Sequence, residues 1–197
     1  GLPGGLLQNV MSHGVAKIAE FLADDVEVVA IGRTSPLLTG LGERQIIDEL
    51  RVIITDVQKT TAYFTFSSQM RPVLHQLCVY GHANGLILDE DRQTLVRLRG
   101  QRYKSYLEQF LPPLTFARQY LKNWAHNAGR FLARDFHVDS GRKHLIEAFH
   151  HSIRSGAPVP IPYREILLTS RIMDAILRQL NEAAARTERG DRLPVLS

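Results

Sequence analysis

The feature that most constrains the fold is a pair of segments in which apolar and polar residues alternate, joined by two residues. Leu50, Val52 and Ile54 alternate within residues 47–57, and Ala62, Phe64 and Phe66 within residues 60–68, the pattern of strands with one buried face. The joint Gln58-Lys59 has hairpin length, although it lacks the favoured Asn-Gly sequence. Further strands are expected at residues 26–32, 73–80, 86–89 and 94–98. Because short turns join successive strands, the sheet is expected to be mostly antiparallel.

Helical periodicity precedes and follows the strands. Apolar residues recur at helical spacing in residues 4–22, 114–134, 140–155 and 163–185. The pair Pro112-Pro113 is expected to open the second of these helices, and Gly156 to cap the third. The order predicts an α+β domain, with an open, mostly antiparallel sheet and helices packed on one face. The other face is left for solvent or an interface and displays Arg51, Ile53, Tyr63 and Thr65.

The composition is that of a globular chain in a reducing compartment. No apolar run reaches the roughly 20 residues that a membrane helix needs, and residues 1–14 lack the basic flank of a signal peptide. The one cysteine, Cys78, excludes an internal disulfide and lies in an apolar run, so a buried, inert thiol is expected. These observations predict a cytoplasmic location.

The histidines of the sequence are candidates for two kinds of site, a metal site and a proton-transfer site. His144, His150 and His151 share one predicted helix but form no His-x-x-x-His pair, so no metal site is expected. His13 is of more interest, because Asn9 lies four residues before it, on the same face of the predicted first helix. A histidine titrates near neutral pH and can move a proton, while an amide can hold a hydroxyl group. The competing interpretation is a helix histidine with no chemical role.

The sequence contains no visible dinucleotide site. Gly32, Gly40 and Gly42 lie in a predicted loop, without the Gly-x-Gly-x-x-Gly motif that follows a strand and opens a helix. Neither a P-loop nor a nucleophile elbow is present in the sequence. We therefore expect no cofactor to bind to this chain itself.

Two motifs at opposite ends of the chain resemble one enzyme family. Residues 4–13 (GGLLQNVMSH) resemble the signature Gly-Gly-x-Leu-x-Asp-x-Gly-x-His of the Gfo/Idh/MocA oxidoreductases. Residues 144–162 (HLIEAFHHSIRSGAPVPIP) resemble the helix–Gly–x–Pro–Pro segment of the same family. The resemblance covers residues 4–183 and implies the dihydrodipicolinate-reductase-like C-terminal domain, which binds substrate and forms dimers.

The resemblance implies a reaction and roles for three residues. The family transfers a hydride between NAD or NADP and a hydroxyl-bearing carbon of a sugar or cyclitol. By resemblance His13 is the catalytic acid and base, and Asn9, His13 and Lys17 contact a sugar-like substrate. Asn9 stands where the family has aspartate, so a proton relay through this position is in doubt, and Lys17 replaces a frequent acid. A homo-oligomer through the open sheet face is also implied.

The resemblance also defines the expected domains. Residues 1–183 are expected to form the substrate-binding and oligomerisation domain, with a helical insertion at about 103–137 and a mobile tail at 184–197. The N-terminal Rossmann domain of the family is missing from this sequence. The chain alone is therefore not expected to catalyse the reaction, whereas the full-length parent protein is expected to be an NAD(P)-dependent oxidoreductase. The sheet is expected to lack an edge strand and to be open to pairing with another chain.

The insertion contains most of the net charge of +4. Residues 115–134 contain no acid and four basic residues, Arg118, Lys122, Arg130 and Arg134, with aromatic residues among them. One basic stripe does not resemble the broad basic face of a nucleic-acid binder. The preferred interpretation is a helix packed on the domain with its basic face in water. The alternatives for this helix are a lid or dimer arm, or contact with a phosphate-bearing substrate, a partner protein or an anionic membrane, although a few basic residues give only marginal membrane affinity. For the whole chain, the alternatives are a non-enzymatic protein-interaction domain and a peripheral membrane module that uses helix 114–134.

Overall fold

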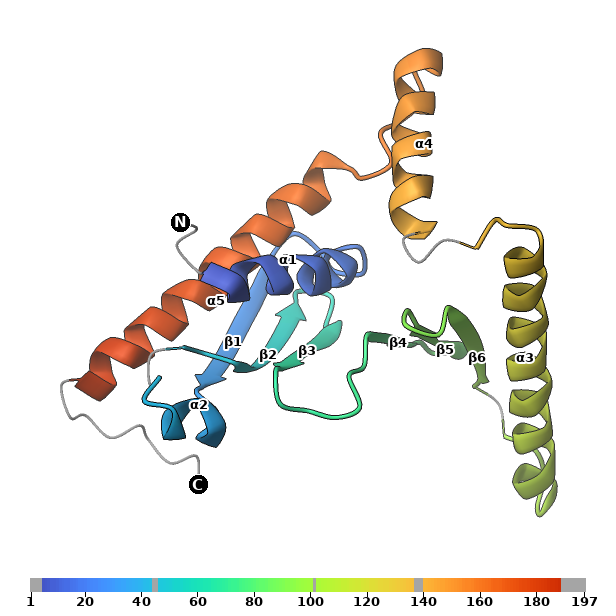
Figure 1. The fold of residues 1–197 in the computed structure, drawn as a ribbon, viewed down its shortest axis with the longest axis horizontal. Helices are drawn as coiled ribbons and strands as arrows, with labels where there is room; N and C mark the ends of the chain where they lie inside the picture. Colours follow the sequence, from blue (N-terminus) through green and yellow to red (C-terminus); the bar gives the residue numbers. More distant parts are fainter. Residues whose placement is uncertain (1–4, 44–45, 101, 137–139, 189–197) are drawn as a thin grey trace. The chain divides into compact units, whose positions relative to one another are not determined.

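The computed structural model describes residues 5–43, 46–100, 102–136 and 140–188 and divides the chain into two compact units. Unit 1 comprises residues 1–70 and 148–197, and unit 2 comprises residues 71–147. Unit 1 contains α1 (Gly5–Ala19), β1 (Val26–Arg33), α2 (Pro36–Gly40), β2 (Glu49–Asp56), β3 (Thr61–Ser67) and α5 (Tyr163–Glu188) (Figure 1). Unit 2 contains β4 (Gln76–Tyr80), β5 (Asn84–Asp89), β6 (Thr94–Arg99) and α3 (Leu107–Leu132). The boundary at residues 147–148 falls within α4 (Ser140–Ser155).

The expected hairpin forms the centre of unit 1. β2 pairs antiparallel with β1 on one side and with β3 on the other. In this register Val52 pairs with Ala30 and with Phe64, so the apolar residues of all three strands share one face. The opposite face carries the neighbouring row of Val29, Ile53 and Tyr63, all exposed. The alternation predicted for residues 47–68 is therefore confirmed.

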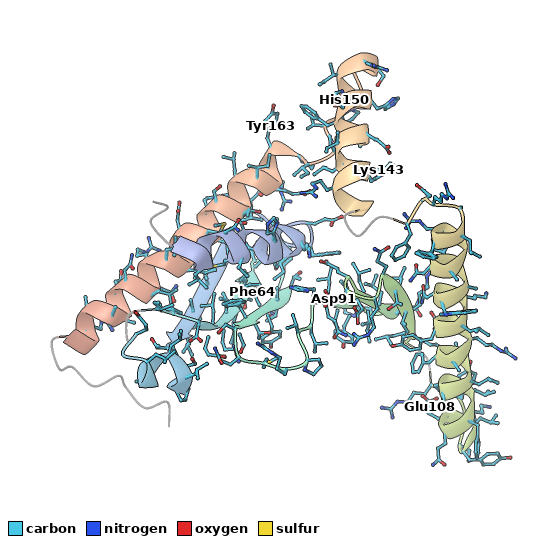
Figure 2. All side chains as sticks on the ribbon, viewed as in Figure 1. Phe64, Asp91, Glu108, Lys143, His150 and Tyr163 are labelled. Carbon is cyan, nitrogen blue, oxygen red and sulfur yellow. The ribbon has the colours of Figure 1, made fainter. Side chains whose placement is uncertain are left out.

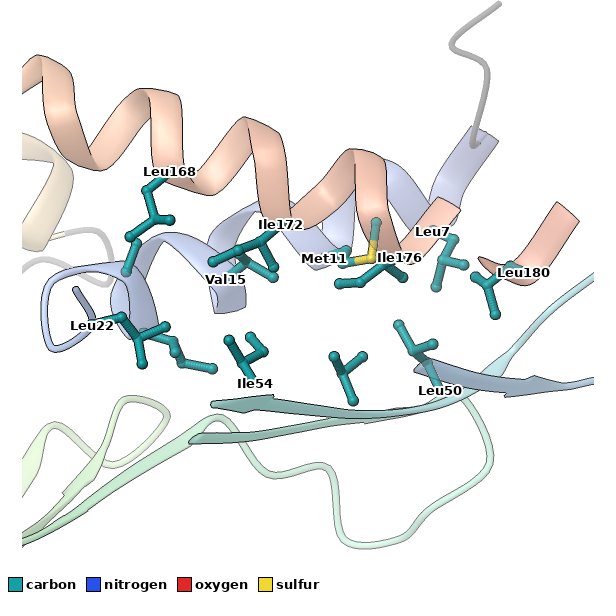
Figure 3. Packing of buried hydrophobic residues seen from close by; sticks show 13 residues of the cluster. Leu7, Met11, Val15, Leu22, Leu50, Ile54, Leu168, Ile172, Ile176 and Leu180 are labelled. Atoms are coloured by element: carbon teal, nitrogen blue, oxygen red, sulfur yellow. The ribbon is translucent and has the colours of Figure 1, made fainter. Parts of the chain in front are cut away.

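Two helices cover the apolar face of this sheet. α1 contacts α5 and β3, and α5 also contacts β1. Their side chains interdigitate above β2, as the close view in Figure 3 shows. Burying each large aliphatic side chain contributes about 1.5–3 kcal/mol. The buried cluster consists of Leu7, Met11, Val15, Ile18, Ala19, Leu22, Leu50, Val52, Ile54, Leu168, Ile172, Ile176 and Leu180.

Two glycines allow these layers to approach closely. A Cβ atom on Gly14 of α1 would lie 2.1 Å from the ring of Phe64, which Figure 2 labels beneath the helix. A Cβ atom on Gly32 of β1 would lie 2.6 Å from Cδ2 of Leu180 in α5. Since real Cβ atoms do not approach other atoms this closely, both positions require glycine for the observed packing.

Two aspartates fix the loops of unit 1. Asp56 accepts hydrogen bonds from the backbone N–H groups of Ala23 (2.9 Å) and Thr60 (2.8 Å). The bond from Ala23 is the main cause that lowers the pKa of Asp56. Asp48 accepts from the Ser35 N–H at 2.6 Å and from the Ser68 hydroxyl at 2.8 Å. Burial works to raise the pKa of Asp48, but its hydrogen bonds outweigh burial and lower it.

Unit 2 is built differently, because its sheet has almost no buried core. β5 pairs antiparallel with β4 and β6. Among the described residues of unit 2, Val96 is the one buried hydrophobic residue, and no residue of α3 is buried. α3 instead contacts β6, the edge strand of this sheet. Unit 2 therefore combines an antiparallel sheet with a helix along its edge.

The fold class is confirmed as α+β, but three sequence predictions are wrong. The strands form two three-stranded sheets and not one open sheet, because β3 and β4 do not pair. Pro112 and Pro113 do not open α3, which begins at Leu107 and contains both prolines. Cys78 is exposed and not buried, because β4 is an edge strand in a unit with little core.

Two expected segments can be compared with the elements of the structure. The helical insertion expected at about 103–137 stays a prediction, and α3 of unit 2 lies within this range. α5 continues to Glu188 and so includes residues 184–188 of the expected tail, while residues 189–197 lie outside the described residues. Gly156 does end α4, with φ of +68° and an N–H bonded to the Ser152 carbonyl at 2.9 Å.

Candidate functional site

The three residues expected at the substrate site lie on the outer face of α1. Asn9, His13 and Lys17 are spaced by four residues, and all three side chains are exposed. The opposite face of α1 is committed to the core through Met11 and Val15. The structure therefore brings the three predicted residues into one line on a rigid helix.

The chemistry available along this line is hydrogen bonding and proton transfer. The His13 ring can accept or donate a proton at either nitrogen, and the Asn9 amide can both donate and accept. Near the start of the line, the Ser12 hydroxyl donates to the Asn9 backbone carbonyl at 2.7 Å. Neither of the two hollows found among the described residues is lined by Asn9, His13 or Lys17. The line is thus an open surface in this chain.

The glycines of unit 1 do not fit a dinucleotide. Gly32 lies within β1 and is covered by Leu180 and Ile47. Gly40 ends the five-residue helix α2, where no helix follows to bind phosphate at its N-terminus. Among the described residues, no three His, Cys, Asp or Glu side chains gather as ligands for a metal ion. Gly32 and Gly40 therefore do not form a phosphate-binding loop.

A hollow in unit 2 was missed by the sequence analysis. It has a volume of about 560 Å³ and lies between α3 and the start of β6. Its lining is Arg92, Thr94, Tyr120, Trp124, Asn127, Ala128, Phe131 and Phe136. Helical periodicity places the α3 residues of this list on neighbouring faces of the helix. Only the attachment of α3 along β6 brings Arg92 and Thr94 beside them. The signal that could have located the hollow was the run of aromatic residues on α3.

The charge in this hollow is already balanced. Nη1 of Arg92 lies 2.5 Å from Oδ2 of the buried Asp89, whose Oδ1 accepts from the Arg92 backbone N–H. Burial works to raise the pKa of Asp89, but the hydrogen bonds from Arg92 outweigh it and lower this pKa. The same pair raises the pKa of Arg92. The hollow therefore suits an apolar or aromatic group more than a free anion.

Amide side chains attach α3 to the edge of β6. Gln119 accepts from the Arg97 N–H at 2.8 Å and donates to the Arg97 carbonyl at 3.1 Å. Asn123 donates to the Leu95 carbonyl at 2.9 Å, and Asn127 donates to the Arg92 carbonyl at 3.0 Å. Because these residues are four apart, they form one line on α3 that pairs the backbone groups an edge strand would leave open. We call Gln119, Asn123 and Asn127 the amide line.

In unit 1, Gln179 pairs the backbone of an edge strand in the same way as the amide line does in unit 2. Gln179 of α5 accepts from the Ala30 N–H at 2.9 Å and donates to the Val28 carbonyl at 2.7 Å. Val28 and Ala30 of β1, an edge strand of the unit 1 sheet, are therefore paired by the chain itself.

Comparisons with family models, curated proteins and solved structures found no match to this chain. The resemblance to the Gfo/Idh/MocA family therefore rests on the two motifs quoted above. Within the described residues, no helix is long and apolar enough to cross a membrane.

Proposed function

We propose that this chain is the substrate-binding and dimerisation domain of a Gfo/Idh/MocA-type dehydrogenase. The observation that carries the proposal is the exposed line of Asn9, His13 and Lys17 on α1. Residues 4–13, which resemble the family signature, contribute two of these residues, and their helix is fixed by the core on its other side. The proposed substrate is a sugar or cyclitol, in the cytoplasm.

His13 would accept the proton of a substrate hydroxyl group and return it in the reverse direction. Oxidation of an alcohol carbon requires that this proton leaves together with a hydride, which NAD(P) accepts in the family. In the family a separate dinucleotide-binding domain holds the cofactor, so the cofactor would bind in that domain of the proposed parent enzyme. Asn9 would hold a second hydroxyl by hydrogen bonds, and Lys17 would donate to a substrate oxygen.

The outer face of the unit 1 sheet would form the homodimer. Its central row of Val29, Ile53 and Tyr63 exposes 55%, 44% and 71% of these side chains. A contiguous row of apolar side chains on a sheet face is typical of an interface. An Ile53→Glu variant is expected to shift the sedimentation coefficient from that of a dimer to that of a monomer.

The test of the proposed enzyme is NAD(P)-dependent oxidation of a sugar and cyclitol panel by the protein made from the complete reading frame. His13→Ala is expected to lower kcat/KM by about 10²–10⁴-fold. Asn9→Ala is expected to raise KM, and Glu20→Gln, an exposed change just beyond α1, to leave both constants unchanged. Turnover that survives His13→Ala, or no turnover on any panel member, would reject the proposal.

A further inference from the structure

α3 exposes a line of apolar side chains along its whole length. Phe110, Leu114, Ala117, Leu121, Trp124, Ala128 and Phe131 follow one another at steps of four and three residues. We call these seven residues the apolar seam. None is buried, and Phe110, Leu121, Trp124 and Phe131 expose 64%, 63%, 66% and 70% of their surface.

The seam is exposed because α3 is attached by another face. With about 100° per residue, the amide line lies roughly a third of a turn away from the seam. Hydrogen bonds from Gln119 and Asn123 to β6, and from Asn127 to the Arg92 carbonyl just before it, thereby fix the rotation of the helix. The helix is therefore preformed. No residue of its apolar seam is buried, although Trp124, Ala128 and Phe131 also line the open hollow beside the start of β6.

The polar side of α3 is cationic. Arg118 and Lys122 are exposed, and neither has an ion-pair or hydrogen-bond partner in the part of the chain that the structure describes. The one acid of α3, Glu108, already accepts from the Tyr103 N–H at 2.5 Å. Unit 2 has twelve Lys and Arg against seven Asp and Glu, a formal charge of +5. The rest of the chain has twelve against thirteen, so unit 2 accounts for the positive charge of the whole.

We propose that α3 docks unit 2 on an anionic lipid surface. A helix with aromatic and aliphatic residues on one face and cations on the other is the pattern that lies in the membrane interface. The seam would enter the headgroup region, and Arg118 and Lys122 would bind lipid phosphates. The docking goes beyond the proposed dehydrogenase activity and does not depend on it.

A second copy of α3 fits the seam less well. In a paired coiled coil the positions that flank the seam carry opposite charges. Here they include Arg118, Tyr120 and Asn127, with no acid among the flanking residues of α3. Two cationic helices would also repel each other, whereas an anionic surface attracts both their charge and their apolar side chains.

The only tryptophan of the chain, Trp124, provides the assay. We would record its fluorescence emission while adding vesicles of phosphatidylcholine alone or vesicles that also contain about 30% phosphatidylglycerol. This lipid fraction imitates the charge density of an anionic membrane. A blue shift with the anionic vesicles is expected, weakening as salt is added. Arg118→Gln with Lys122→Gln should weaken the partition coefficient about 25-fold, at about fivefold for each cation near the surface.

The control variant carries Leu37→Ser and Leu41→Ser, which remove exposed apolar residues from unit 1 outside the proposed dimer face, and should bind vesicles as the unchanged chain does. Leu121→Ser should reduce binding while circular dichroism shows the helix intact. No shift with anionic vesicles, or an equal shift with neutral vesicles that survives Arg118→Gln with Lys122→Gln, would overturn the proposal. A shift that depends on protein concentration without vesicles would assign the seam to a second copy.

Discussion

The two units contain the same sheet, three antiparallel strands, but hold it together by different means. In unit 1 two helices cover one sheet face and bury thirteen hydrophobic residues. In unit 2 one helix lies along the sheet edge, and Val96 is the single hydrophobic residue buried in its described part. A three-stranded sheet needs a covered apolar face for independent stability, and only unit 1 has one. Unit 1 should therefore be the stable scaffold, and unit 2 a weaker module with surface left for binding.

The largest difference is expected from removing equivalent apolar side chains. Ile172→Ala on α5 creates a cavity beneath a fully buried position and should cost about 2–5 kcal/mol of the free energy of unfolding. Leu121→Ala on α3 removes a side chain that is 63% exposed, and should change stability by less than about 0.5 kcal/mol. Urea unfolding followed by circular dichroism measures both. Equal losses would show that α3 is packed in solution.

Replacing two helical glycines by alanine should change the stability of the protein in opposite directions. Gly14→Ala places a methyl group against the Phe64 ring, so it should destabilise unit 1 by about 1–3 kcal/mol despite the better helix propensity of alanine. Gly129→Ala on α3 meets nothing within 4 Å and should stabilise that helix by about 0.5–1 kcal/mol. Thermal melts of the two variants compare them directly, and a stabilised Gly14→Ala protein would mean that α1 does not lie on Phe64.

Both edge-capping glutamines can be tested by the same change. Gln119→Leu and Gln179→Leu each remove both the acceptor for a strand N–H and the donor to a strand carbonyl, at a cost of about 1 kcal/mol for each hydrogen bond. In unit 2 this should speed exchange of the Arg97 amide, because little else protects β6. In unit 1 the Ala30 amide should change less, since the core still holds β1 against β2. Amide exchange by NMR would resolve both sites, and identical responses would remove the distinction between the units.

Low pH should reduce the free energy of unfolding of unit 1, with a small contribution from each of two aspartates. The folded-state pKa values of Asp48 and Asp56 lie below the ordinary 3.8, so their ionised forms stabilise the native state. This stabilisation is complete above the unfolded pKa and disappears as pH falls through the lower folded values. The urea concentration at the unfolding midpoint should therefore decrease once the pH is lowered below about 4. Asp48→Asn with Asp56→Asn should flatten the dependence, whereas Asp174→Asn, an exposed change, should not.

The sequence predicted local structure well where one physical signal acted alone. Alternation located β2 and β3, and helical periodicity located α1 and α5, because each has one buried face. The sequence did not predict the split into two sheets, since strand alternation specifies a face and not a neighbouring strand. Cys78 was misplaced for the same reason: an apolar run predicts burial only where another layer covers it.

The candidate site was predictable in part. The spacing of Asn9, His13 and Lys17 placed all three on one helical face, and that placement is what the structure has. The hollow of unit 2 and the amide line were not predictable, because both depend on which strand lies beside α3. The spacing of Gln119, Asn123 and Asn127 was visible, but a line of amides on a helix ordinarily faces water.

Native-state hydrogen exchange, resolved by segment, tests the central contrast most directly. We expect β2 and α5 to exchange only through global unfolding, because they carry most of the buried cluster. Exchange of β4, β5 and β6 is expected through local opening at a markedly lower free energy. Equal protection of β2 and β5, both central strands of three-stranded sheets, would show that the two units do not differ in stability.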